Sequence, residues 1–149
     1  MTTTVGTEDK LERLLTDLVQ LDHDAVLAYD AAIERLGNSA HRSSLAGFRQ
    51  DHLRHIDELG EALSALGITP PQESDMKSWL TQGRVVLGGL MGDKAILQAM
   101  KTNEDDTNTA YERAVQHRNA SPSLRSVLTH GLEDERRHRE WLVETIRLL

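Results

Sequence analysis

Six ionisable side chains at regular places in this sequence have the residue types of a metal centre. In chain order they are Asp22, His52, His55, Glu104, Glu135 and His138. Carboxylates and imidazoles together are typical ligands of iron, manganese and zinc in proteins. Within the Glu-x-x-His segment at 135–138, the acid and the imidazole lie three residues apart, on the same face of a helix. We therefore expect these six side chains to be metal ligands, provided that the folded chain brings them together.

Four long helices are predicted from apolar spacing and from helix-end signals. They run from about Glu8 to Leu36, from 39 to 66, from 93 to 119, and from 122 to the C-terminus. Gly37-Asn38 is the expected stop of the first helix, Asp93 the expected N-cap of the third, and Ser121-Pro122 the start of the fourth. Between the two helix pairs, residues 67–92 form a long crossover, which we expect to carry a short helix from Ser74 to about Leu90. The fold class is thus an all-α, antiparallel four-helix bundle, expected as a single domain over residues 1–149.

Each predicted helix carries an apolar heptad seam that is interrupted near its middle by the candidate ligands. Asp22 lies 15 residues before Gly37, and Glu104 lies 15 residues before Asn119. The candidate ligands of the second and fourth helices follow the same turns at similar distances. At 1.5 Å per residue, all six lie about 20–24 Å from a connecting turn. We therefore expect them to form one polar layer across the bundle.

The two halves of the chain resemble each other, which predicts a pseudo-two-fold axis through the polar layer. A shift of 82 residues aligns the first helix with the third, and a shift of 83 aligns the second with the fourth. The matched pairs include Asp22 with Glu104, Tyr29 with Tyr111, Asp51 with Asp134, Arg54 with Arg137, and His55 with His138.

These residues resemble the carboxylate-bridged di-iron proteins of the ferritin-like superfamily, which place a Glu on two helices and a Glu-x-x-His on the other two. Residues 135–138 match that motif, Glu104 and Asp22 match the single carboxylates, and His52 stands where the remaining glutamate belongs. The chain is similar to rubrerythrin-like bundles and, through 92–97 and 103–105, to an uncharacterised bacterial branch of ferritin-like proteins. The resemblance implies an iron centre that reacts with peroxide or dioxygen.

Histidine at position 52 keeps several alternatives open. With Glu135 as the one remaining bridging glutamate, a mononuclear centre or a manganese or zinc site competes with a di-iron centre. The three histidines and three acids also fit a metal-free buried ionic network. In that case the protein is a non-catalytic stress or interaction bundle rather than an oxidoreductase.

Amino-acid composition indicates which classes of partner the protein is expected to lack. With 17 basic and 24 acidic residues, the formal charge of −7 argues against nucleic-acid binding. The longest apolar stretch, Val85–Met91, is far shorter than a membrane-spanning helix. The sequence starts without a signal peptide, so we expect a cytoplasmic protein. The sequence has no cysteine, so any electron donor must be external. Trp79 and Leu80 make the crossover a candidate contact between two copies of the chain in a homodimer.

Overall fold

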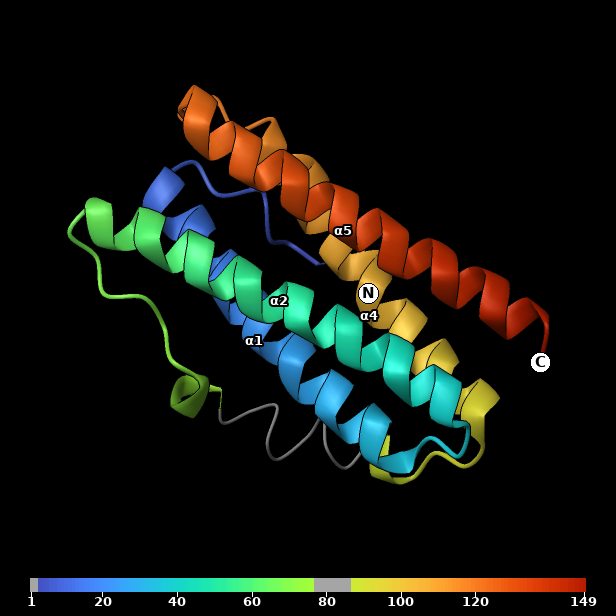
Figure 1. Ribbon diagram of the computed structural model, residues 1–149. Coiled ribbons are helices and arrows are strands. Elements are labelled where there is room, and N and C mark those ends of the chain that lie inside the picture. The colour runs from blue at the N-terminus through green and yellow to red at the C-terminus, as the bar shows by residue number, and fades with distance from the viewer. Residues whose placement is uncertain (1–2, 77–86) are drawn as a thin grey trace.

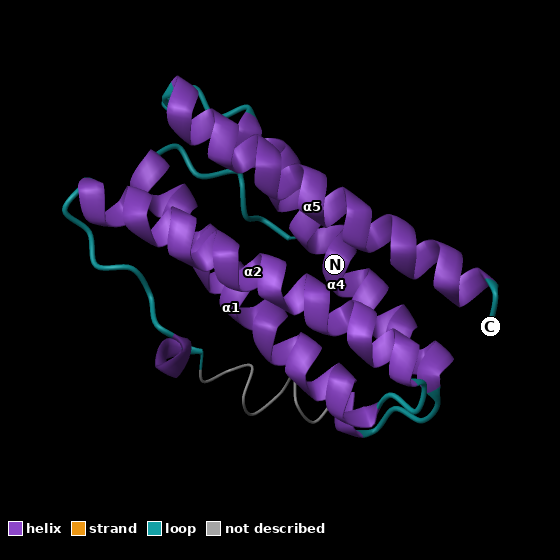
Figure 2. Ribbon diagram, in the orientation of Figure 1, coloured by secondary structure: helices purple, strands orange, loops and turns teal. Residues whose placement is uncertain are grey.

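The computed structural model describes residues 3–76 and 87–149, and within these ranges all regular secondary structure is helical. Four long helices pack side by side (Figures 1 and 2). They are α1 (Leu11–Arg35), α2 (Ser39–Ala65), α4 (Asp93–Val115) and α5 (Pro122–Arg147), with a short 3₁₀ helix, η1, at Glu73–Asp75. The expected four-helix bundle is confirmed. No helix in the described part of the chain is both long enough and apolar enough to cross a membrane.

Each helix runs antiparallel to its neighbours. α1 packs against α2 and α4, and α5 packs against α4 and α2. The Asp93 carboxylate accepts hydrogen bonds from the backbone N–H groups of Gly37 (2.8 Å) and Asn38 (3.1 Å), so the start of α4 lies beside the end of α1. At the opposite end of the bundle, Arg113 near the end of α4 donates to the carbonyl of Thr3 (2.7 Å). The connection between α2 and α4 therefore joins opposite ends of the bundle, as the crossover requires (Figure 1).

Local sequence explains the helix ends. The Asn38 side chain caps α2 by accepting from the N–H groups of Ala40 and His41. Ser121 caps α5 in the same way, with Pro122 in the first turn. α2 ends at Ala65 and is followed by Gly67, whose positive φ of 79° glycine adopts at little cost. There the N–H groups of Gly67 and Ile68 bond back to Ser64 and Leu63, a Schellman motif.

Three expectations at the helix ends need correction. α1 begins at Leu11 rather than Glu8, since the Glu8 carboxylate accepts the N–H of Gly6 within the preceding turn. The N-cap of α4 is Gly92; Asp93 is already helical, and its carboxylate holds the α1–α2 turn instead. α4 ends at Val115, earlier than the expected Asn119. Most of the predicted crossover helix, with Trp79 and Leu80, lies outside the described residues.

Two apolar clusters fill the bundle on either side of its middle. One, which includes Leu36, Leu45 and Leu97, lies toward the α1–α2 turn. The other, which includes Leu63 and Leu128, lies toward the α4–α5 turn. The space between them is occupied by ionisable side chains, which are therefore walled off from water at both ends of the bundle.

Candidate metal centre

The six expected ligand side chains lie together in this middle layer. Asp22 comes from α1, His52 and His55 from α2, Glu104 from α4, and Glu135 and His138 from α5. All are buried, and the most exposed of them, His55, has only 4% of its surface accessible. The heptad seams place them there, because each occupies a position that is otherwise filled by Leu, Ala or another core residue.

Four of these residues form a first group, the Asp22 set: Asp22, His52, His55 and Glu135, which can each offer one atom within 4.8 Å of the others. Asp22 Oδ1 lies 2.8 Å from Nδ1 of His52 and 3.3 Å from Nδ1 of His55. Glu135 Oε1 lies 3.5 and 3.4 Å from the same two nitrogens. Two carboxylate oxygens and two imidazole nitrogens thus face one another.

A second group, the Glu104 set, contains His52, Glu104, Glu135 and His138. Glu104 Oε1 lies 3.3 Å from Nε2 of His52 and 3.3 Å from Nδ1 of His138. Glu135 Oε2 lies 3.6 Å from that same His138 nitrogen. The two sets share Glu135 and His52, and the His52 ring turns one nitrogen toward each.

Hydroxyl groups fix the carboxylates from the outside. The Tyr111 hydroxyl donates to Asp22 Oδ2 (2.6 Å), and the Tyr29 hydroxyl donates to Glu104 Oε1. Each tyrosine thus holds the acid of the other half, as the internal repeat implies. Thr107 Oγ1 lies 2.9 Å from Glu104 Oε2 and 3.0 Å from Glu135 Oε2. Because Thr107 and its neighbour Asn108 have Ala25 and Val26 as their counterparts in α1, the α4 half of the layer is more polar.

Two aspartates outside the expected set orient the histidines. Asp134 Oδ2 on α5 lies 2.9 Å from Nε2 of His55 on α2, and Asp51 Oδ2 on α2 lies 2.7 Å from Nε2 of His138 on α5. In both rings Nδ1 is left facing the centre. From the sequence, which matches Asp51 with Asp134 in the repeat, Asp51 beside the α2 seam is expected to be solvated, with an inward-turned spare ligand as the alternative, and Asp134 has no expected role. The repeated Asp-x-x-Arg-His pattern, present in both halves, was the signal that could have identified them.

Two arginines join these aspartates into one network. Arg54 contacts Asp51 (3.1 Å) and Asp134, and Arg137 contacts Asp51 (2.7 Å) and Asp134 (3.1 Å). The guanidinium groups lie at the edge of the layer, half exposed. Each aspartate is therefore fixed by two cations as well as by its histidine.

Burial and mutual contacts shift the pKa values of the buried groups. Burial alone raises the pKa of Asp22, but the hydrogen bonds of His52 and His55 outweigh burial and lower it to about 2. Burial lowers the pKa of His55, yet its bonds to Asp134 and Asp22 raise it to about 12. The pKa of Glu135 is raised, first by burial and then by the nearby charge of Glu104. Among the three candidate carboxylate ligands, Glu135 is therefore the one whose charged form the layer favours least.

Two inward-facing atoms have no hydrogen-bond partner among the described residues: Glu135 Oε1 and His138 Nδ1. Both residues have no exposed surface. Leaving a buried polar atom unpaired costs about 1–3 kcal/mol, and more for a charged group. The donor chemistry of the layer fits a bound cation, and so does the unpartnered Glu135 Oε1, which faces Nδ1 of both His52 and His55.

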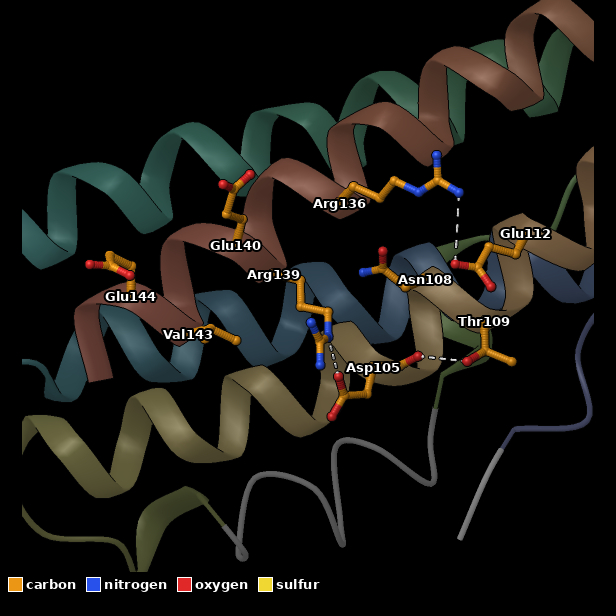
Figure 3. Close-up of a pocket in the computed structure, with 9 residues that line it drawn as sticks. All are labelled: Asp105, Asn108, Thr109, Glu112, Arg136, Arg139, Glu140, Val143 and Glu144. Atoms are coloured by element: carbon orange, nitrogen blue, oxygen red, sulfur yellow. Dashed lines mark hydrogen bonds and ion pairs between the residues drawn. The ribbon is translucent and has the colours of Figure 1, made fainter. Parts of the chain in front are cut away.

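A separate hollow of about 560 Å³ opens on the surface between α4 and α5, as Figure 3 shows. Each of its two arginines pairs with an acid of α4: Arg139 contacts Asp105 (2.6 Å), and Arg136 contacts Glu112 (3.9 Å). Asn108 lines it and donates to the backbone carbonyls of Glu104 and Glu135. The hollow therefore backs onto the buried layer, and both of its arginines are paired with acids of α4.

Comparison with known sequence families assigns the chain to one family. Residues 10–117 match the sequence family described as "Domain of unknown function (DUF2383)", a match over well more than half of the chain. No curated protein matches the chain.

Proposed function

Because the chain belongs to the DUF2383 family, a domain of unknown function, we propose its function from the buried layer itself: it is a metal-binding protein with a ferritin-like, rubrerythrin-like bundle. The observation that carries the proposal is the unpartnered Glu135 Oε1, which faces Nδ1 of His52 and of His55 at 3.5 and 3.4 Å. A cation among these atoms satisfies all three at once.

Charge in the layer supports the same conclusion. Five carboxylates meet there, those of Asp22, Asp51, Glu104, Asp134 and Glu135. The two guanidinium groups of the network leave a deficit of about three positive charges when the imidazoles are neutral. Burying an uncompensated charge costs several kcal/mol, so the deficit must be met by protons on the histidines or by a metal ion. A divalent ion supplies most of it while leaving the imidazole lone pairs to act as ligands.

Iron is the ion we propose first, with manganese and zinc as alternatives, because all three accept mixed carboxylate and imidazole ligands. Iron or manganese would supply redox chemistry toward peroxide or dioxygen, with electrons from an external donor. The protein's own residues would exclude water, through the two flanking apolar clusters, and orient the imidazoles, through Asp51 and Asp134. Residues 1–149 would act as one domain, and the protein would work in the cytoplasm.

Thermal unfolding tests the proposal. A ligand that binds only the native state stabilises it by RT ln(1 + [L]/Kd), about 2.7 kcal/mol at a hundredfold excess over Kd. For a chain of this length we expect Tm to rise by about 5–10 °C when Fe²⁺, Mn²⁺ or Zn²⁺ replaces chelator. His130→Ala, which removes an exposed histidine of α5, should keep the full increment. Asp22→Asn should lose most of it.

A second function is favoured by one specific observation: the histidines lie between carboxylates on both ring nitrogens. His52 lies between Asp22 and Glu104, and His55 lies between Asp22 and Asp134. Protonated imidazoles would make these contacts a metal-free ionic network that fixes helix register, in a non-catalytic stress or interaction protein. A Tm that is indifferent to all three metals would establish this reading instead.

A further inference from the structure

We propose that the layer binds a single metal ion, held by the Asp22 set, and that Glu104 and His138 are not ligands. This inference rests on the proposed metal-binding function and narrows it. The juxtaposition that carries it is the His52 ring between two carboxylates, with Nδ1 2.8 Å from Asp22 Oδ1 and Nε2 3.3 Å from Glu104 Oε1.

His52 cannot serve both sets as an ordinary ligand. A neutral imidazole has one nitrogen that carries a proton and one that offers a lone pair. When Nδ1 binds an ion in the Asp22 set, Nε2 carries the proton and donates it to Glu104. The shared residue therefore makes the two sets alternatives, and the structure favours one of them.

Every ligand of the Asp22 set has its other polar atom held by a partner. His52 Nε2 faces Glu104, and His55 Nε2 faces Asp134. The outer oxygen of Asp22 accepts from Tyr111 (2.6 Å), and the outer oxygen of Glu135 lies 3.0 Å from Thr107. Such partners orient ligands and raise their basicity.

The Glu104 set lacks this separation of inner and outer atoms. Oε1 of Glu104, which faces the nitrogens of His52 and His138, is the same oxygen that accepts the Tyr29 hydroxyl. An ion there would compete with a phenol for one oxygen. In the Asp22 set, by contrast, Asp22 Oδ1 faces the two imidazoles while Tyr111 bonds the opposite oxygen, Oδ2.

Spacing also fits a four-coordinate ion. With bonds of about 2.0–2.1 Å, neighbouring ligand atoms of a tetrahedral site lie about 3.3–3.4 Å apart. Four contacts of the Asp22 set measure 2.8, 3.3, 3.4 and 3.5 Å. One of those atoms is the unpartnered Glu135 Oε1. The set is thus nearly arranged for a tetrahedral ion.

Co²⁺ is a suitable probe, because tetrahedral Co²⁺ absorbs visible light far more strongly than the six-coordinate aqueous ion. We would titrate chelator-treated protein with Co²⁺, following absorbance, and count Zn²⁺ per chain by native mass spectrometry. We expect one ion per chain and a strong tetrahedral spectrum. The repeat supplies a matched pair of variants: His55→Gln should abolish that spectrum and weaken Co²⁺ binding at least about a hundredfold, whereas His138→Gln should keep the spectrum and bind within about threefold of wild type.

Other results would distinguish failure of the single-ion inference from failure of the proposed metal-binding function. Two Co²⁺ or Zn²⁺ per wild-type chain, a strictly six-coordinate spectrum, or equal losses in the two variants would overturn the single-ion inference while leaving metal binding intact. The wild-type stoichiometry needs no variant, so it decides the matter even if a substitution prevents folding. Failure of the wild type to bind Co²⁺, Zn²⁺, Mn²⁺ or Fe²⁺ would overturn the proposed function itself.

Discussion

The two aspartates that orient the histidines offer a sharp test, because they occupy equivalent places in the repeat. Asp134 Oδ2 lies 2.9 Å from Nε2 of His55, and Asp51 Oδ2 lies 2.7 Å from Nε2 of His138. Both carboxylates also contact Arg54 and Arg137. Exchanging either for asparagine removes one charge at nearly constant shape, so the two variants differ chiefly in which histidine they affect.

We expect Asp134→Asn to weaken metal binding and Asp51→Asn to leave it nearly unchanged. Loss of an outer partner of a ligating histidine costs about 10–100-fold in affinity, which corresponds to about 1.4–2.7 kcal/mol. Of the two histidines that these aspartates orient, only His55 belongs to the Asp22 set, so only Asp134→Asn should show this cost. Zn²⁺ affinity would be measured near neutral pH by competition with a chromophoric chelator.

The same measurement can refute the reasoning. Equal weakening by both substitutions would mean that His138 also ligates, as in a dinuclear centre. Weakening by Asp51→Asn alone would place the ion in the Glu104 set. If neither substitution changes affinity, the aspartates do not act through ligating histidines. Circular dichroism of each variant would show that the bundle is retained.

Three further predictions concern the protein without metal. Gly131→Ala should lower the free energy of unfolding by about 1–3 kcal/mol, because the added Cβ would lie 2.5 Å from a tyrosine ring. The control variant Gly47→Ala, whose Cβ would meet nothing within 4 Å, should be neutral or stabilising by up to about 1 kcal/mol. Urea unfolding would compare the two variants. In chelator, Tm should be highest between about pH 4 and 6.5. Because the pKa of His138 is raised to about 10, stability should fall as the pH rises from 6.5 toward 10. Because the pKa of Asp22 is lowered to about 2, stability should also fall as the pH drops from 3.8 toward 2. A Tm that rises above pH 7 would contradict this. Thr107→Val should cost about 1–3 kcal/mol in urea unfolding, because it removes the hydroxyl that hydrogen-bonds the buried carboxylates.

The sequence by itself determined the helices and the height of the polar layer. Apolar residues at heptad spacing define each buried face, and an ionisable residue within such a face has to lie in the core. Counting residues from the turns then set Asp22 and Glu104 at matching heights, because the rise per residue of a helix is constant. Caps such as Ser121-Pro122 were readable for the same reason: they depend on neighbours within one turn.

Contacts between helices were decided only by the tertiary structure. Asp93 had the residue type of an N-cap, but its carboxylate binds the backbone of another turn, 56 residues away in sequence at Gly37. Likewise, Asp51 faces α5, where it bonds His138, instead of solvent. Helical periodicity gives the face of a residue to within part of a turn, and side-chain rotamers and the rotation of the neighbouring helix decide the rest.

The orientation of the His52 ring is likewise a feature of the site that the sequence alone does not predict. The position of His52 in the α2 seam follows from the sequence, and so does its place in the polar layer. Which nitrogen faces Asp22 and which faces Glu104 depends on the ring's rotamer and on packing between α1, α2 and α4. A periodic pattern carries no information about that rotation, yet the proposed single-ion site depends on it.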